Sequence, residues 1–400
     1  MKLTPVHKAL EIILNQSEDF GVEQVNFIDS LGRVLKEDII ADRDFPPFNR
    51  VSMDGVAVSF QEFEKGIRIF EIEGVQAAGS AQLTLKNSSN CIEIMTGATL
   101  PKNADVVIPY EQVKIENGFA KVTIEETLYF KNIHRKGKDQ KEGDIIIHKN
   151  TLISPAEIGV ITTVGKSKVT VAKHPKVMII STGDELVEVN ETPKEYQIRR
   201  SNVHTLVSLL KQLQIPSETT HIKDDKDALK SKIEQYLIDY DVLLFSGAVS
   251  KGKFDFIPEV LDELGVDKLF HRVAQRPGKP FWYGKKDDKS IFAFPGNPIS
   301  TFVNCIKYFY PWFQKSVGLE SDNKEFAVLA EDITFKPQMT YFLQVKLENK
   351  NGTLLAIPVH GNGSGDLANL VKVDAFLELP ADKTEFKKGD IFPILRYRSF

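Results

Sequence analysis

A short polar segment that follows an apolar run is the first candidate for chemistry in this sequence. The apolar residues Val177–Ile180 lead directly into the polar residues Ser181–Glu185. We expect the run to be a strand buried on both faces, and open α/β sheets bind ligands beyond the ends of such strands. Exposed amides there suit phosphate, whereas the carboxylates of Asp184 and Glu185 suit Mg²⁺ or the polar edge of a ring. The same segment would serve equally well as a helix N-cap with an acidic first turn.

A second candidate loop, Ser246–Asp255, follows the apolar run Val242–Phe245. Its glycine, serine and lysine residues could approach a phosphate closely, although the ending of a Walker loop is absent. Asp255 could hold a metal ion or cap the helix predicted after it. Asp224–Asp225, ahead of another predicted helix, is open to the same two interpretations. A carboxylate at each of three loops favours Mg²⁺ without being diagnostic of it.

Basic residues and a proline-flanked turn supply the opposite charge and further amides. Arg272, Arg276 and Lys279 form a local cluster that offers bidentate donors to phosphate or molybdate. A solvated rim would have the same composition. Pro295–Pro298 follows the run Ile291–Phe294 and fixes a tight turn whose amides would point at a ligand. A purely structural turn, with no ligand, would explain that segment about as well.

Other polar turns lie earlier in the chain, among short alternating apolar runs. They are Ser52–Gly55, Met95–Ala98 and Arg135–Asp139, and ordinary hairpin chemistry accounts for each. The eight histidines are scattered, and no His/Cys/carboxylate set has zinc-ligand spacing. No Gly-x-Ser-x-Gly elbow is present to support a Ser/His/Asp triad. The residues alone therefore predict a multidomain α/β protein with a site suited to phosphate and Mg²⁺.

The segment from Val177 to about Val317 must position the strand-end loops. Its alternation of strands and helices predicts a parallel, doubly wound α/β domain. The expected strands are Val177–Ile180, Val242–Phe245, Ile291–Phe294 and one near Phe270–Ala274. The expected helices are Asn202–Leu213, Asp227–Tyr240, Phe256–Leu264 and Pro298–Phe313.

The remaining segments predict three further structural units. Residues 1–40 are expected to be helical, with a second short helix through Asp29–Ile39. Short alternating runs from Val51 to about Lys149 predict an inserted β-rich module, and the last 80 residues predict a small β-barrel-like domain. The predicted domains are residues 1–43 with 141–172, residues 44–140, residues 173–318 and residues 319–400.

Composition limits the classes of function. A chain of 400 residues is expected to form two to four domains. A net charge of −4 gives no general attraction to nucleic acid. Cys91 and Cys305 match no metal or redox spacing, so we expect both to be buried apolar residues. No signal-peptide core and no 18-residue apolar run is present, so no membrane association and a cytoplasmic location are expected.

Six segments, taken in order, resemble the MoeA family of molybdopterin molybdenumtransferases, which is related to the E domain of gephyrin. Each is weak alone, but their order and spacing across nearly the whole chain are specific. The segments are Met53–Gly55 (MDG), Met95–Glu111 (MTGATLPKNADVVIPYE), Ser181–Leu186 (STGDEL), Ser246–Phe256 (SGAVSKGKFDF), Arg276–Pro280 (RPGKP) and Phe294–Ser300 (FPGNPIS).

The resemblance implies a reaction, a cofactor and an assembly. Molybdate would be inserted into adenylylated molybdopterin, with Mg²⁺, giving molybdenum cofactor and releasing AMP. The enzyme would be an elongated homodimer whose cleft joins the α/β domain of one subunit to β modules of the other. The implied catalytic residues are Asp54, Thr96, Asp139, Glu185, Asp224 and Asp255, of which Glu185, Asp224 and Asp255 are the implied metal ligands. The expected substrate-binding residues are Arg272, Arg276, Lys279, Gly296, Asn297 and Ser364.

The chain departs from the usual family pattern at several positions. Val56 replaces a tyrosine, Ala248 a glycine, Arg276 a lysine and Arg200 an aspartate, and Lys251 stands where charge is uncommon. These differences affect expected substrate detail more than reaction class, because the acidic set is intact. Two alternative functions stay open, a related molybdopterin-binding adenylyltransferase and a non-catalytic scaffold. The surrounding β modules argue against the adenylyltransferase, because such enzymes resemble the α/β domain alone. The intact carboxylates argue against the scaffold.

Overall fold

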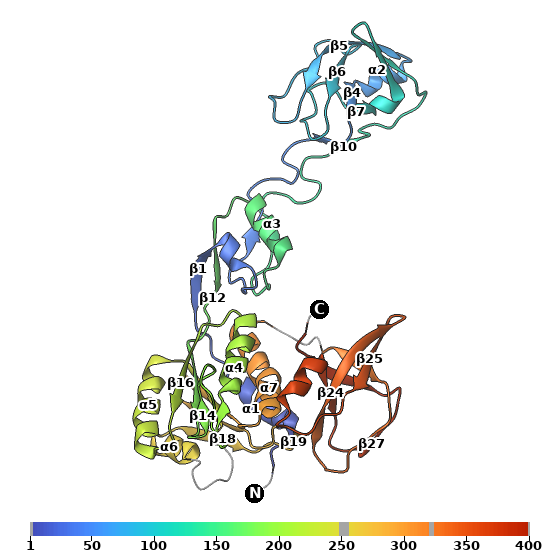
Figure 1. The fold of residues 1–400 in the computed structure, drawn as a ribbon. Helices are drawn as coiled ribbons and strands as arrows, with labels where there is room; N and C mark the ends of the chain where they lie inside the picture. Colours follow the sequence, from blue (N-terminus) through green and yellow to red (C-terminus); the bar gives the residue numbers. More distant parts are fainter. Residues whose placement is uncertain (1–2, 248–255, 320–323, 399–400) are drawn as a thin grey trace.

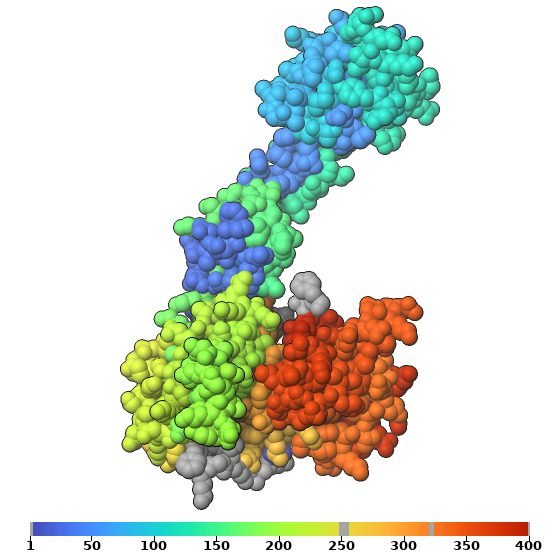
Figure 2. Space-filling model, viewed as in Figure 1, coloured from blue at the N-terminus to red at the C-terminus, as the bar shows by residue number. Residues whose placement is uncertain are grey.

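The computed structural model describes residues 3–247, 256–319 and 324–398, and it has an elongated shape. A β module occupies one end, a small connecting domain follows, and an α/β domain with a C-terminal barrel beside it forms the other end (Figures 1 and 2). Within the described residues, no helix is long and apolar enough to cross a membrane.

The α/β domain is built on a six-stranded sheet with the order β16-β13-β17-β21-β20-β18. The pairings among β16, β13, β17 and β21 are parallel, and those of β20 with β21 and with β18 are antiparallel. The strands are β13 (Val177–Thr182), β16 (Ser217–Ile222), β17 (Val242–Ser246), β18 (Asp267–His271), β20 (Trp282–Lys286) and β21 (Lys289–Phe294).

Helices cover both faces of this sheet, which confirms the predicted doubly wound α/β class. All six residues of β13 are buried, and its first four alternate between two cores: Ile179 belongs to one and Ile180 to the other. The helical segments are α4 (Ser201–Gln212), α5 (Lys226–Asp239), α6 (Ile257–Glu263), α7 (Pro298–Asn304), the π-helical turn η3 (Cys305–Phe309) and α8 (Tyr310–Ser316).

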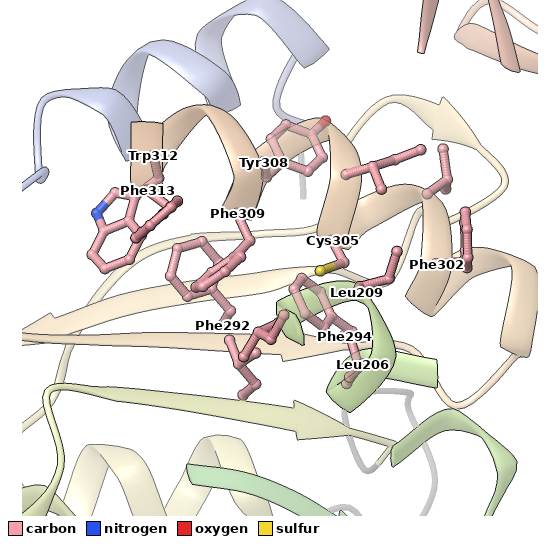
Figure 3. Packing of buried hydrophobic residues seen from close by; sticks show 14 of the residues in the cluster. Leu206, Leu209, Phe292, Phe294, Phe302, Cys305, Tyr308, Phe309, Trp312 and Phe313 are labelled. Atoms are coloured by element: carbon pink, nitrogen blue, oxygen red, sulfur yellow. The ribbon is translucent and has the colours of Figure 1, made fainter. Parts of the chain in front are cut away.

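The larger of the two cores is rich in aromatic residues. Figure 3 shows Phe292 and Phe294 of β21 beneath Phe309 and Trp312 of the η3–α8 segment. Helix α1 (Val6–Leu14) adds its apolar side chains to the same core, and Trp312 Nε1 donates a hydrogen bond of 3.1 Å to the Gln16 carbonyl. The N-terminal helix is thus packed against the α/β domain.

The connecting domain corrects part of the expectation for residues 1–40. Helix α1 is present, but the helix expected at Asp29–Ile39 is not, since Gly32 adopts a φ of +77° and ends a short 3₁₀ turn. The elements are β1 (Val22–Asn26), η1 (Phe27–Ser30), β2 (Ile39–Ile40), β11 (Ile145–Ile147), α3 (Pro155–Thr163) and β12 (Lys168–Ala172). Strands β1 and β12 pair in antiparallel fashion.

The inserted module contains a six-stranded sheet with the order β7-β4-β6-β5-β9-β8. Strand β4 lies in its interior, between β6 and β7. The elements are β3 (Arg50–Val51), β4 (Gly55–Val58), α2 (Phe60–Glu64), β5 (Ile69–Gln76), β6 (Cys91–Ile94), β7 (Val106–Pro109), η2 (Tyr110–Gln112), β8 (Val113–Glu116), β9 (Phe119–Val122) and β10 (Ile133–His134).

The C-terminal domain contains a closed five-stranded barrel, as the sequence predicts. Its strands follow the order β24-β25-β22-β28-β26, and β26 pairs back with β24. The elements are β22 (Phe326–Leu329), β23 (Ile333–Thr334), β24 (Thr340–Lys350), β25 (Thr353–Pro358), η4 (Leu367–Lys372), β26 (Ala375–Leu379), β27 (Glu385–Phe386) and β28 (Ile391–Arg396). The short strand β19 (Gln275–Arg276) links the α/β domain to β24.

Candidate functional site

A cavity of about 600 Å³ lies at the carboxyl ends of β13, β17 and β21. This is the edge at which parallel sheets bind ligands. It brings together four of the residues expected at the site, which are Glu185, Asp224, Gly296 and Asn297. The three loops that follow the apolar runs of the sequence therefore meet at one place, as far as the structure describes them.

The loop after β13 is not the start of a helix. It leads into the short strand β14 (Leu186–Val187), which pairs with β15 (Ile198–Arg199), so the helix-cap interpretation of this segment is wrong. Gly183 has a φ of +127°, and a Cβ placed on it would lie only 2.6 Å from Glu185 Oε2. The glycine therefore allows the Glu185 carboxylate to fold back over the strand end, in the wall of the cavity.

The two acidic residues after β16 have different roles. Asp225 caps α5, because its Oδ1 accepts a hydrogen bond of 2.8 Å from the Ala228 amide. Asp224 instead lines the cavity, and its amide donates to Asp184 Oδ1 at 3.4 Å. The Asp184 side chain thus connects the loops after β13 and β16, and the capping interpretation holds for Asp225 alone.

The acidic residues fit Mg²⁺ by their donor chemistry. Glu185 and Asp224 provide carboxylate oxygens at the cavity, and Mg²⁺ typically binds one or two protein carboxylates together with water and substrate phosphates. Asp255, the third predicted ligand, lies outside the described residues. No group of three or more His, Cys, Asp or Glu residues arranged for a metal is found in the part of the chain that the structure describes.

Arg200 is a buried cation in the wall of the same cavity. Only 8% of its surface is exposed, and it forms an ion pair with Glu188. Its Nε also donates a hydrogen bond of 3.1 Å to Ser181 Oγ, which lies 3.1 Å from His221 Nδ1. Arg200 thus places positive charge at the cavity.

The pKa of His221 reports the positive charge of Arg200. Burial, and then the positive charge of Arg200, lower the pKa of His221 below its usual value. In Arg200→Gln we therefore expect the pKa of His221 to rise, so that the imidazole becomes protonated at a higher pH. NMR of the histidine ring as a function of pH would measure the change. Arg199→Gln, which removes an exposed guanidinium from the neighbouring residue, should leave the titration nearly unchanged, and an unshifted titration in Arg200→Gln would contradict the assignment.

A second cavity, of about 480 Å³, lies between the α/β domain and the barrel. Arg276 and Ser364 line it, as do Tyr341 and His360. Gly365 lines both cavities, which places them side by side. The structure therefore brings the predicted residues Arg276 and Ser364 next to the strand-end site.

Two hydrogen bonds connect the loop of Ser364 to the turn after β21. Asn297 Nδ2 donates to Ser364 Oγ at 2.9 Å, and the Ile299 amide donates to the Ser364 carbonyl at 3.1 Å. The side chains of Arg272 and Lys279 line neither cavity. Arg272 is partly exposed and adopts a φ of +78°, while Lys279 is exposed.

A buried polar network supports the Arg276–Lys279 loop, and sequence reasoning missed it. Gln275 Nε2 donates to Asn304 Oδ1 at 2.7 Å, and Asn304 Nδ2 donates to the Gly278 carbonyl at 3.2 Å. Tyr308 Oη donates to Gln275 Oε1. The available signal was an asparagine and a tyrosine inside the apolar segment 302–309, since buried polar side chains require partners.

The other three predicted residues lie in and beside the β module. Asp54 Oδ1 accepts a hydrogen bond of 2.6 Å from the Thr96 amide, and the hydrogen bonds from Thr96 lower the pKa of Asp54. Asp139 Oδ1 lies 2.8 Å from His134 Nε2. Figure 1 shows this module at the opposite end of the molecule from the α/β domain. A single chain therefore does not bring Asp54, Thr96 and Asp139 to the cavity.

The fold and the order of these sites agree with known proteins. The N-terminal region of MoeA (domains I and II) matches residues 4–165, a probable molybdopterin-binding domain matches residues 178–315, and the C-terminal region of MoeA (domain IV) matches residues 327–397. A molybdopterin molybdenumtransferase from Synechocystis sp. is 41% identical over 97% of this chain and 98% of its own length. The chain belongs to the MoeA family.

Further relatives agree with this assignment. A molybdopterin molybdenumtransferase from Staphylococcus epidermidis is 32% identical over 98% of this chain and 96% of its own length. Two structures of the molybdopterin biosynthesis MoeA protein from Pyrococcus horikoshii have TM-scores of 0.84, at 30% and 28% identity. They cover 100% and 99% of this chain, and both are covered completely. The MoeA resemblance inferred from the sequence motifs is confirmed.

Proposed function

We propose that this MoeA-family chain is a molybdopterin molybdenumtransferase that inserts molybdenum from molybdate into adenylylated molybdopterin and releases AMP. The observation that carries the proposal is full-length similarity to enzymes of that name, at 41% identity for the Synechocystis protein. The adjoining cavities support it, because one presents carboxylates at the ends of parallel strands and the other presents Arg276 and Ser364. Together they suit a ligand that combines a ring system, phosphates and an oxyanion.

The charges of the site suggest which residues would hold the metal ion and which would hold the oxyanions. Glu185 and Asp224, with Asp255, would hold Mg²⁺, which when bound would neutralise charge on the phosphoanhydride of the substrate. Arg276 and the amides around Asn297 would hold oxyanion groups, because guanidinium and backbone N–H groups both donate to them. The dithiolene sulfurs of the substrate would accept the molybdenum. No covalent intermediate with the protein is required.

The proposed assembly is a homodimer with a composite site. Asp54, Thr96 and Asp139 lie in and beside the module that Figure 1 shows at the opposite end of the molecule from the α/β domain. A second copy could present its module to that cavity, and a two-fold dimer would then contain two equivalent sites. Light scattering after size exclusion tests the assembly directly, and a monomer at assay concentration would exclude the composite site.

AMP release from adenylylated molybdopterin, with molybdate and Mg²⁺, tests the proposed reaction. We expect Glu185→Gln and Asp224→Asn each to lower kcat by roughly a hundredfold, because each removes a carboxylate that supports the metal. Asp225→Asn is the matched control, since asparagine caps a helix as well as aspartate does. Lack of turnover by the intact chain would support the scaffold function instead. Full activity in both cavity variants would contradict the metal site.

A further inference from the structure

We propose that Arg200, Thr182 and the first turn of α4 form a phosphate-binding subsite within the 600 Å³ cavity. Ser201, Asn202 and Val203 of that turn line the cavity together with Arg200 and Thr182. The assignment of the phosphate to the reacting ligand rests on the proposed function. The subsite itself rests on the geometry and charge of these residues.

The first observation is the orientation of α4. This helix has twelve residues, and the amides of its first turn lack partners within the helix and carry partial positive charge. Its N-cap residue, Arg200, makes no side-chain capping bond. Asn202 Nδ2 donates to the Gly296 carbonyl at 2.7 Å, which fixes the turn against the loop after β21. The helix N-terminus is thus held at the cavity.

The second observation is a buried hydroxyl. Thr182 lines the cavity and is only 5% exposed, yet its Oγ1 has no hydrogen-bond partner among the described residues. Leaving a buried polar group without a partner costs about 1–3 kcal/mol. The residue lines the cavity while the oxygen itself is covered, so a rotation of the Thr182 side chain would present the hydroxyl to a ligand oxygen there.

The third observation is the state of Arg200. Its guanidinium is buried, whereas the side chain of its ion-pair partner Glu188 is 51% exposed. An arginine has five N–H donors, and the bonds to Ser181 and Glu188 leave others available for an oxyanion. Arg199, the other cation of the cavity wall, is exposed and donates from Nε to the Glu191 carbonyl. Arg200 is therefore the better-placed partner for an anion.

The cavity volume indicates what carries the anion. Phosphate and molybdate share the chemistry of a tetrahedral, doubly charged oxyanion, and both would suit these donors. A cavity of 600 Å³ matches an organic ligand of nucleotide or pterin size better than a bare inorganic ion. The subsite is therefore assigned to a phosphate group on a larger ligand.

Isothermal titration of the full chain with AMP, adenosine, inorganic phosphate and molybdate tests the subsite without catalysis. We expect AMP to bind more tightly than either inorganic ion and adenosine to bind weakly. Arg200→Gln should weaken AMP binding by about tenfold, and Thr182→Val should weaken it to a smaller extent. Lys211→Gln, which removes an exposed positive charge at the other end of α4, should bind AMP as the wild type does.

Glu188→Gln separates a ligand-binding arginine from a purely structural one. Removing the competing carboxylate should strengthen AMP binding by about threefold, whereas loss of a merely structural ion pair would weaken binding or leave it unchanged. This variant also keeps the proposal testable if Arg200→Gln does not fold. Equal affinity for AMP and adenosine would overturn the subsite. Unchanged AMP binding in both Arg200→Gln and Glu188→Gln would also overturn it. Normal AMP binding without molybdenum insertion would contradict the proposed function and leave the subsite supported.

Discussion

Two inactive variants of this protein should restore activity to each other when their chains are combined. Asp54→Asn removes a predicted catalytic carboxylate from the β module, and Glu185→Gln removes one from the cavity of the α/β domain. In a mixed dimer, one site would combine the intact cavity of the first chain with the intact module of the second. With random pairing, half of the dimers are mixed and one of their two sites is intact, which gives about one quarter of wild-type AMP release.

Co-expression with two affinity tags would isolate the mixed dimers, and their AMP release should then rise to about half that of the wild type, because one of the two sites in every dimer is intact. The matched control combines Asp54→Asn with Asp139→Asn, because both changes damage the module side and no intact site can form. Each variant alone is expected to be nearly inactive. Restored activity in the control pair as well, or no activity in the test pair, would contradict a site shared between subunits.

Replacing Gly55 with alanine should unfold or displace the β module. A Cβ at Gly55 would lie 2.0 Å from the carbonyl oxygen of Ile108, well inside van der Waals contact. The clash cannot be relieved by rotating a side chain, since both strands are held in the sheet by backbone pairing of Gly55 with Ile94 and Pro109. We expect a loss of about 3 kcal/mol or more in the stability of the module, together with loss of AMP release because Asp54 is displaced.

Thermal unfolding followed by circular dichroism would measure the effect on stability. Gly74→Ala is the matched control in the same module, because its Cβ would meet only Leu83 Cδ1, at 3.8 Å. The control should melt within a few degrees of the wild type and retain activity. An unchanged melting profile for Gly55→Ala would show that the module tolerates a shift of β4.

The sequence was sufficient to predict the three central strands of the α/β domain and the loops that follow them. The apolar runs that became β13, β17 and β21 are buried on both faces, so they contain few polar residues and end sharply at glycine or proline loops. Those loops meet at one cavity because the carboxyl ends of parallel strands share one edge of the sheet. In this region the apolar pattern of the sequence therefore predicts both the strands and the place where their loops meet.

Two strands of the same sheet, β16 at one edge and β20 between β21 and β18, were not predicted. Strand β16 is mostly polar, with the sequence SETTHI and mostly incomplete burial, so it carries no buried apolar run. Strand β20 contains Gly284 and two lysines and forms a hairpin with β21, and its pairings with β21 and β18 are antiparallel. As an edge strand, β16 has only one paired neighbour, and its sequence is correspondingly less restricted. The glycine and the two lysines of β20 interrupt the apolar run by which a buried strand is recognised.

The motif order by itself determined the family and the candidate chemistry, because a motif is a local run of residue types. Only the tertiary structure decided which candidates lie together. It placed Glu185, Asp224, Arg276 and Ser364 at two adjoining cavities and left the β module, whose strand β4 follows Asp54, at the far end of the molecule. It also revealed the bonds of the buried Arg200 side chain with residues 181 and 188, which depend on how separate segments of chain pack. Such contacts between distant segments leave no periodic signal along the chain.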